Sequence, residues 1–179
     1  MSTITDTDAQ TAATRTTQVY RVYIKAEPER VWAAITSPEW TDRYGYGGRI
    51  EFDRLEAGSP YRHYTSEAMR AMNAPDVAID GEVVEVDEPR KLVMTWRMAM
   101  DDGLAAEGFT TLTYELEPRP GGLTRLTVVH DLTGAPRLQL LLSGGMEDEG
   151  AGGGWAWVLS DLKSLLESGS SLGGGGGPQ

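Results

Sequence analysis

The sequence predicts an α+β domain in which a curved antiparallel sheet is covered by a C-terminal amphipathic helix. Strand-like segments rich in β-branched and aromatic residues follow one another, several joined by short turns, which favours an antiparallel meander. The last segment, Trp155 to Leu166, changes to helical periodicity and presents one apolar stripe. The stripe has to be buried, and the sheet is the only partner large enough. We therefore expect helix and sheet to enclose an apolar cavity of ligand size.

The first part of the domain predicts a strand followed by two short helices. Residues 17–25 (TQVYRVYIK) are rich in β-branched and aromatic side chains, as strands are. Pro28 suits a first helical turn, and apolar residues follow it at helical spacing. Ser37 and Pro38 predict a break, with Ser37 as the N-cap of a second short helix that ends at the glycine cluster of residues 45–48.

Six further strands are predicted in the middle of the chain. Turn-forming residues separate them, for example Gly-Ser-Pro, Asp-Glu-Pro and Asp-Asp-Gly. The six segments are Arg49–Arg54, Tyr61–Ser66, Val77–Val86, Lys91–Met98, Gly108–Glu117 and Leu123–Leu132. Together with the first strand they predict a sheet of about six or seven strands.

The C-terminal helix has two distinct faces. Its apolar stripe consists of Trp155, Leu159, Leu162 and Leu166. The polar residues expected on the opposite face are Asp161, Lys163, Ser164 and Glu167. The glycines at 150 and 152–154 are unusual, because glycine costs a helix interior roughly 1 kcal/mol relative to alanine. Either the helix begins near Gly154, or glycine is kept because something approaches the backbone there.

Length and composition indicate one domain with two loose ends. The 179-residue chain is about the size of a single domain, which we expect over residues 16–167. Residues 1–15 lack apolar periodicity and are expected to form a disordered arm. Residues 168–179 (SGSSLGGGGGPQ) are expected to form a flexible, disordered Gly-rich tail.

Charge and cysteine content argue against several classes of function. The formal net charge of −11 would repel phosphate backbones and anionic lipid surfaces, so no nucleic acid partner is expected. The absence of cysteine excludes disulfides, thiolate metal ligands and Cys nucleophiles. The N-terminus does not read as a signal peptide, and no apolar stretch approaches the ~20 residues that span a bilayer. We therefore expect a cytoplasmic protein without membrane insertion.

The order of the elements and three sequence stretches resemble a known family. The stretches are AEPERVWAAITSPEW (26–40), GEVVEVDEPRKLVMTWR (81–97) and GGGWAWVLSDLKSLL (152–166). From about residue 17 to 167 the chain resembles the SRPBCC, or START-like, superfamily with the helix-grip fold. Within it, the chain is most similar to the branch of homologues of the activator of heat-shock-protein-90 ATPase. The resemblance implies a cavity between the long C-terminal helix and the concave sheet face. It does not specify a function, because the superfamily includes lipid carriers, hormone receptors, polyketide cyclases and bacterial members without an assigned activity.

Candidate ligand-binding residues lie on the strand faces expected to look into this cavity. The period of two places Met94, Trp96 and Met98 on one face, and Met and Trp form a deformable apolar lining. The alternative is that they are simply core under the helix, since both interpretations require the same inward face. The residues predicted to contact a ligand are Tyr61, His63, Met94, Trp96, Met98, Tyr114, His130, Trp155 and Leu159.

The two histidines are the titratable candidates among them. His130 is in phase with Leu126 and is expected to point inward, where it could act as a general base or bind a polar ligand atom. The alternative is a bond to a neighbouring backbone group or to water. His63 is in phase with Tyr61 and opposite to Tyr64, and one of these two faces is expected to look into the cavity.

No catalytic residue, cofactor or metal site is assigned. Two histidines far apart in sequence, without an HExxH or EF-hand pattern, give little support for a metal. Glu82 and Glu107 could form an acid–base pair, but nothing in the sequence brings them together.

Three functions follow from these observations. The leading one is binding of a small hydrophobic or aromatic molecule in the cavity between helix and sheet. The second is a cyclase, dehydratase or hydrolase that uses the same cavity. The third, implied by the family name, is a co-chaperone-like protein that activates an ATPase partner. Homodimerisation through an exposed strand or loop is left open.

Overall fold

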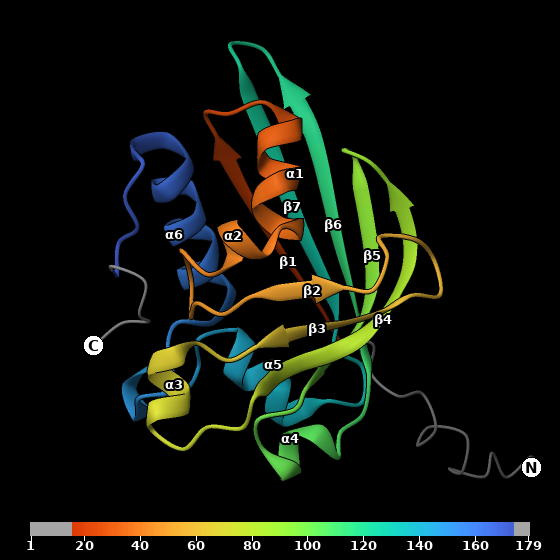
Figure 1. The fold of residues 1–179 in the computed structure, drawn as a ribbon, viewed down its shortest axis with the longest axis vertical. Coiled ribbons are helices and arrows are strands. Elements are labelled where there is room, and N and C mark those ends of the chain that lie inside the picture. Colours follow the sequence, from red (N-terminus) through yellow and green to blue (C-terminus); the bar gives the residue numbers. More distant parts are fainter. Residues whose placement is uncertain (1–15, 174–179) are drawn as a thin grey trace, which may run out of the picture.

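In the computed structural model, which describes residues 16–173, the strands form one antiparallel sheet in the order β1-β7-β6-β5-β4-β3-β2 (Figure 1). The strands are β1 (Thr17–Ile24), β2 (Ile50–Phe52), β3 (Pro60–Tyr64), β4 (Val77–Asp87), β5 (Lys91–Met98), β6 (Thr110–Arg119) and β7 (Leu123–Asp131). Strands β2 to β7 pair in sequence order, and β1 joins at the β7 edge, where Thr17 lies opposite Asp131. The predicted α+β fold with an antiparallel sheet of six or seven strands is confirmed.

Two short helices follow β1, as predicted. They are α1 (Pro28–Thr36) and α2 (Pro38–Thr41), and the extended residue Ser37 separates them. Ser37 occupies the N-cap position of α2, although its side chain makes no capping hydrogen bond. The inner side of α1 buries Trp32 and Ile35 in the core, so this helix covers one end of the concave face.

The sequence gives no periodic signal for four shorter helical segments. These are α3 (Glu67–Ala71), α4 (Asp102–Ala105), α5 (Pro136–Leu142) and η1 (Glu147–Glu149). Each has about two turns or fewer, which is too short for an apolar stripe to repeat. Local capping marks three of them instead: Ser66 Oγ accepts a hydrogen bond from Met69 N, Asp101 Oδ1 accepts one from Leu104 N, and the carboxylate of Glu107 accepts two from the start of α5.

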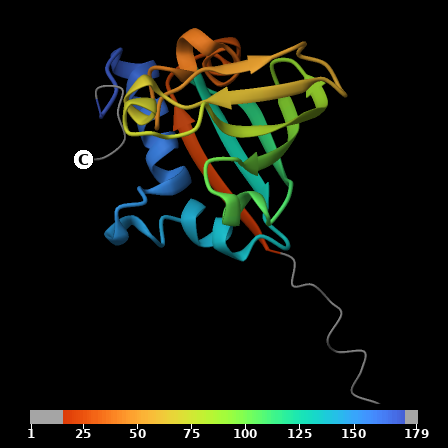
Figure 2. The ribbon, with the colours of Figure 1, turned by 60° about the horizontal axis from the view of Figure 1, so that its bottom comes forward.

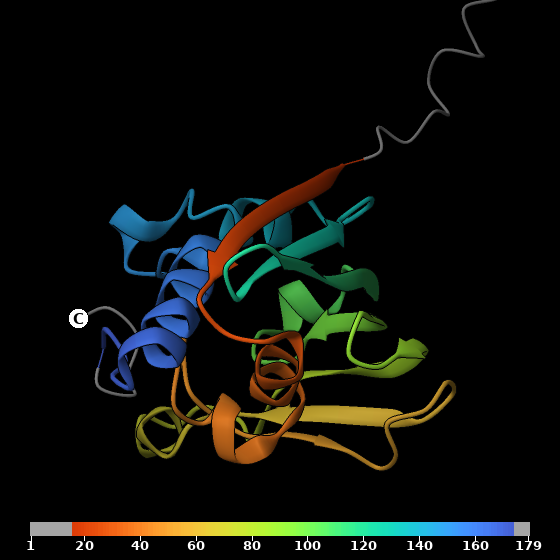
Figure 3. The ribbon, with the colours of Figure 1, turned by 90° about the horizontal axis from the view of Figure 1, so that it is seen from above.

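The last helix, α6 (Gly154–Ser168), lies in the concavity of the sheet beside β1 (Figure 2). Viewed from above, the strands form an arc from β1 to β2, with α1 and α6 on its inner side (Figure 3). The predicted stripe residues are all buried: Trp155, Leu159, Leu162 and Leu166. The helix therefore covers the sheet as the sequence predicts.

One residue of α6 is not where the helical pattern predicts it. Asp161 was expected on the solvent face and is fully buried, so that expectation is wrong. Its carboxylate oxygens accept hydrogen bonds from two backbone amides, Gly45 N at 2.8 Å and Leu172 N at 2.5 Å. Two segments outside the helix supply these donors, and together they remove this side of α6 from water.

The chain turns back against α6 after its last residue. Gly169 closes the helix in the left-handed conformation (φ +79°), and Ser164 Oγ donates to the carbonyl of Ser170 at 2.7 Å. The predicted arm (1–15) and the end of the predicted tail (174–179) lie outside the described residues. Within the described part of the chain, no helix is long and apolar enough to cross a membrane.

Candidate functional site: a cavity beneath the C-terminal helix

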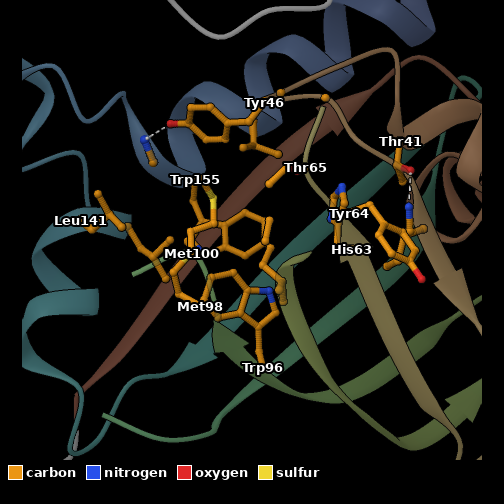
Figure 4. A pocket seen from close by; sticks show the side chains of 18 of the residues that line it. Thr41, Tyr46, His63, Tyr64, Thr65, Trp96, Met98, Met100, Leu141 and Trp155 are labelled. Carbon is orange, nitrogen blue, oxygen red and sulfur yellow. Dashed lines mark hydrogen bonds between the residues drawn. The ribbon is translucent and has the colours of Figure 1, made fainter. Parts of the chain in front are cut away.

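A cavity of about 340 Å³ lies between α6, the concave face of the sheet and the loop that joins α2 to β2 (Figure 4). Its volume is within the range of ~300–1,000 Å³ that is typical of small-molecule sites. The aromatic side chains that line it are Tyr44, Tyr46, Tyr64, Trp96, Tyr114 and Trp155, and its methionines are Met69, Met98 and Met100. None of the described residues that line it is Asp, Glu, Lys or Arg. The lining is therefore mainly apolar and aromatic.

The residues predicted to contact a ligand divide into two groups in the structure. Those that line the cavity are His63, Trp96, Met98, Tyr114 and Trp155. Those that lie in the surrounding core, without lining it, are Tyr61, Met94, His130 and Leu159. All four residues of the second group are buried, so their side chains pack in the core and do not line the cavity.

A β-bulge determines how β3 meets the cavity. The pairing of β3 with β4 shifts register between His63 and Tyr64. Alternation alone would place these neighbours on opposite faces of the sheet. The bulge is the kind of irregularity that re-aims one side chain, and both residues line the cavity (Figure 4).

Several lining residues come from loops and short helices that the sequence analysis does not select. Tyr44 and Tyr46 belong to the loop before β2, Met69 to α3, Met100 to the β5–α4 connection and Leu141 to α5. The sequence feature that could have identified Tyr44 and Tyr46 is their alternation with the glycines at 45, 47 and 48. Aromatic side chains in a Gly-rich loop need another surface to pack against. The other positions carry no pattern of their own.

Contacts to α6 hold the loop of residues 42–48 in place over the cavity. The hydroxyl of Tyr46 accepts a hydrogen bond from Gly154 N at 3.1 Å. The indole N–H of Trp157 donates to Gly45 O at 3.4 Å, and Asp161 accepts from Gly45 N. The loop also approaches β3 so closely that a Cβ on Gly48 would overlap the Tyr64 carbonyl. These contacts join the loop to both walls of the cavity.

His130 supports the cavity wall and does not face the cavity. Its Nδ1 accepts a hydrogen bond from the indole Nε1 of Trp155 (3.2 Å), and its Nε2 lies 2.8 Å from Thr110 Oγ1. Thr110 in turn donates to the carbonyl of Trp96 at 2.8 Å. Burial lowers the pKa of His130 to about 3, with a small opposing effect from Asp131. At neutral pH the ring is uncharged and both its nitrogens are occupied, so it has no free lone pair for a substrate proton.

His63 lines the cavity but is also tied to the backbone. Its Nε2 donates to the carbonyl of Gly48 at 3.1 Å, which connects β3 to the loop above. Burial lowers the pKa of His63, and the carbonyls of Gly48 and Gly47 and the charge of Asp42 partly oppose that effect. We therefore treat His63 as a neutral polar contact in the wall.

The tyrosine hydroxyls around the cavity differ in their hydrogen bonding. Tyr44 donates to Ala34 O at 2.9 Å and Tyr61 to Thr95 O at 2.7 Å. Tyr46 accepts from Gly154 N. Tyr114 lines the cavity, and no described residue is hydrogen-bonded to its hydroxyl. Burial raises the pKa of Tyr114, so the hydroxyl keeps its proton and remains a donor.

The carboxylates considered as an acid–base pair have other positions. Both oxygens of Glu107 accept hydrogen bonds from the first amides of α5, Arg137 N at 2.9 Å and Leu138 N at 3.0 Å. Neither Glu107 nor Glu82 lines the cavity. Among the described residues there is also no group of three or more His, Asp or Glu side chains placed to hold a metal ion.

Residues 25–167 match the family model described as Activator of Hsp90 ATPase homolog 1-like protein. The chain belongs to this family. A search of curated proteins gives no match.

Several solved structures share the fold of this chain. The crystal structure of MLL2253 from Mesorhizobium loti is 23% identical, with a TM-score of 0.61 over 84% of this chain and 96% of that one. CalU16 from Micromonospora echinospora is 17% identical, with a TM-score of 0.58 over 86% and 77%. The solution structure of the Aha1 dimer from Colwellia psychrerythraea is 17% identical, with a TM-score of 0.58 over 86% and 98%. These similarities show the fold alone, and it is the helix-grip fold that the sequence predicts.

Proposed function

We propose that this protein binds a small hydrophobic or aromatic molecule in the cavity between α6 and the sheet. The observation that supports the proposal is the space itself. The same inward-facing residues could have filled the core completely, yet about 340 Å³ remains between them. Because protein interiors are normally close-packed, side chains around such a space forfeit packing contacts. A ligand would restore them.

The chemistry of the lining indicates the type of ligand. Aromatic rings and three methionines surround the cavity, and no Asp, Glu, Lys or Arg is among the described residues that line it. Such walls favour flat or irregular apolar molecules, because methionine adapts its shape and aromatic rings stack or meet edge to face. An acid–base enzyme is less well supported, since His130 is neutral and fully hydrogen-bonded outside the cavity.

A binding experiment with a blocked cavity tests the proposal. The unchanged protein and the variant Ile79→Trp are titrated with aromatic probes such as fluorene, following tryptophan fluorescence and the melting temperature. Ile79 lines the cavity, so a larger side chain there occupies part of the space. We expect saturable binding and stabilisation of the unchanged protein, and at least about tenfold weaker binding by the variant.

Val84→Trp provides the matched control. Val84 lies on the same strand, β4, but its side chain is half exposed on the outside of the sheet. This variant should bind as the unchanged protein does. Equal binding by Ile79→Trp and the unchanged protein would place the probes elsewhere and contradict the proposal.

A homodimer is a further part of this proposal. The solution structure from Colwellia psychrerythraea is described as a dimer, which is a statement about that protein. Light scattering of the present chain over a range of concentrations, with and without a bound probe, decides whether it pairs.

A further inference from the structure

The hydroxyl of Tyr114 and the indole N–H of Trp96 belong to the cavity wall, and neither has an acceptor among the described residues. From them we infer the class of ligand: a neutral, mainly aromatic molecule with a carbonyl or similar acceptor oxygen, held by the hydroxyl of Tyr114 and the indole N–H of Trp96. The inference rests on the proposed function and makes it more specific. It predicts that the cavity distinguishes two ligands of equal shape when one of them carries an acceptor oxygen and the other does not.

The hydroxyl of Tyr114 differs from those of its neighbours. The hydroxyls of Tyr44 and Tyr61 each donate to a backbone carbonyl, that of Ala34 and that of Thr95. The Tyr114 ring packs edge to face on Trp155, with ring centroids 6.1 Å apart, which fixes its direction. Its hydroxyl has no hydrogen-bond partner in the described part of the chain.

The indole of Trp96 is held in a similar way. It meets His130 edge to face, with ring centroids 5.1 Å apart, and the backbone carbonyl of Trp96 accepts from Thr110. Figure 4 shows its nitrogen directed away from β5, toward the other side chains of the cavity. The indole N–H of Trp155, by contrast, donates a hydrogen bond to His130 Nδ1. That of Trp96 has no acceptor among the described residues.

Neither donor is sealed inside the core. Among the described residues, only the Nε atoms of Arg119 and Arg125 are completely buried without a partner. Since Tyr114 and Trp96 both line the cavity, their free donors open onto its space. A bound hydrocarbon would cover these donors and leave them unsatisfied, which costs free energy.

The two free groups also define the polarity of the ligand. An indole N–H can only donate, so the ligand must supply an acceptor. Burial keeps the Tyr114 hydroxyl protonated, so it too is available as a donor. No Lys or Arg is among the described residues of the lining, and a carboxylate brought into this apolar space would lose its hydration without gaining a counter-charge. A neutral ketone, quinone or amide oxygen therefore fits better than an acid.

A pair of probes with the same shape tests the inference. Fluorene and fluorenone differ only in that the second carries a carbonyl group, and both are titrated into the full chain. We expect fluorenone to bind about two- to tenfold more tightly for each hydrogen bond that it accepts. Tyr114→Phe should reduce that preference from both sides: fluorenone loses a hydrogen bond, and fluorene no longer leaves this hydroxyl unsatisfied and binds more tightly. Tyr61→Phe is the control, because its hydroxyl donates to Thr95 O and does not line the cavity; this variant should keep the full preference.

The indole signals give a second readout that does not depend on any variant being stable. In protein with isotope-labelled tryptophan, the N–H signal of Trp96 should move downfield with fluorenone and not with fluorene. Equal affinity for both probes would overturn the inference and leave the proposed function in place. Failure of both probes to bind would overturn the proposed function as well. A full carbonyl preference in Tyr114→Phe, with an unmoved Trp96 signal, would also overturn the inference.

Discussion

The indole Nε1 of Trp155 donates a hydrogen bond to Nδ1 of His130 at 3.2 Å, and this contact fixes the tautomer of the histidine. Because the indole can only donate, Nδ1 must be the acceptor, and the ring proton lies on Nε2. Nε2 then donates to Thr110, whose own proton goes to the carbonyl of Trp96. The chain of bonds joins α6 to β7, β6 and β5 at the wall of the cavity.

The first prediction concerns pH. The pKa of His130 is lowered to about 3 in the folded protein, whereas an unfolded chain takes up this proton near pH 6.5. The contribution of the neutral ring to stability is therefore complete above about pH 6.5 and decreases as the pH falls toward 3, by up to ~1.4 kcal/mol per pH unit. The free energy of unfolding of the unchanged protein, minus that of His130→Asn, should be about 2 kcal/mol smaller at pH 5 than at pH 7.5.

Urea unfolding at the two pH values measures this difference. The pKa of His63 is lowered as well, but His63 is present in both proteins, so its effect cancels in the comparison. The same holds for the carboxylates. A difference between the two proteins that does not change with pH would show that His130 is not a buried neutral ring.

The second prediction tests the contribution of the Thr110 hydroxyl, which links His130 to the carbonyl of Trp96. Thr110→Val keeps the shape of the side chain but removes the acceptor for His130 Nε2, and we expect a loss of about 1–3 kcal/mol in the free energy of unfolding. Thr111→Val changes the next residue, whose side chain is exposed on the same strand. It should stay within about 0.5 kcal/mol of the unchanged protein. Equal losses in denaturant unfolding would refute the assigned network.

The part of the fold that follows from the sequence is the part set by periodicity. Alternation correctly places Met94 and Trp96 of β5 and His130 of β7 on the inner face, and the stripe of Leu159 and Leu162 on the buried side of α6. These predictions succeed because one buried face in a sheet or helix imposes a regular spacing on its apolar residues.

Periodicity cannot separate a cavity wall from a packed core, because both use the same face. Trp96 lines the cavity and Met94, two residues earlier, does not. The difference depends on how much space the surrounding side chains leave, and Tyr44 and Tyr46 help to define that space from a loop without periodic pattern. A hydrogen bond between elements distant in sequence, such as that of Trp155 with His130, is likewise visible only in three dimensions.

The third prediction concerns the residue that contradicted its helical pattern. Asp161 accepts from Gly45 N and Leu172 N, so each carboxylate oxygen has one backbone donor. Asp161→Asn replaces one of these oxygens by an amide NH₂ that meets an N–H, and we expect a loss of about 1–3 kcal/mol. Amide hydrogen exchange at Gly45 should become faster, since the loop over the cavity loses a tie to α6.

Asp148→Asn is the control for this change of charge. Asp148 is an exposed residue of η1, and its substitution removes the same charge without disturbing a buried hydrogen bond. Its stability and its exchange at Gly45 should match the unchanged protein. If the two variants behaved alike, the burial of the Asp161 carboxylate would not matter for the loop.

The fourth prediction explains the glycines ahead of Trp155. Gly154 begins α6 with φ +66°, and a Cβ there would overlap the carbonyl of Leu142. Gly150 also has a positive φ (+85°), but a Cβ there would meet no atom within 4 Å. Alanine at either position is strained by ~1–2 kcal/mol in the left-handed conformation, and alanine at 154 must in addition displace the backbone of Leu142.

We expect Gly150→Ala to lower the free energy of unfolding by about 1 kcal/mol, and Gly154→Ala to lower it by at least about 2 kcal/mol more, as measured by urea unfolding. Equal costs would mean that conformation alone selects glycine. A larger cost at 154 would mean that both explanations offered by the sequence hold there, because the helix begins at a residue that the end of α5 approaches too closely for any side chain.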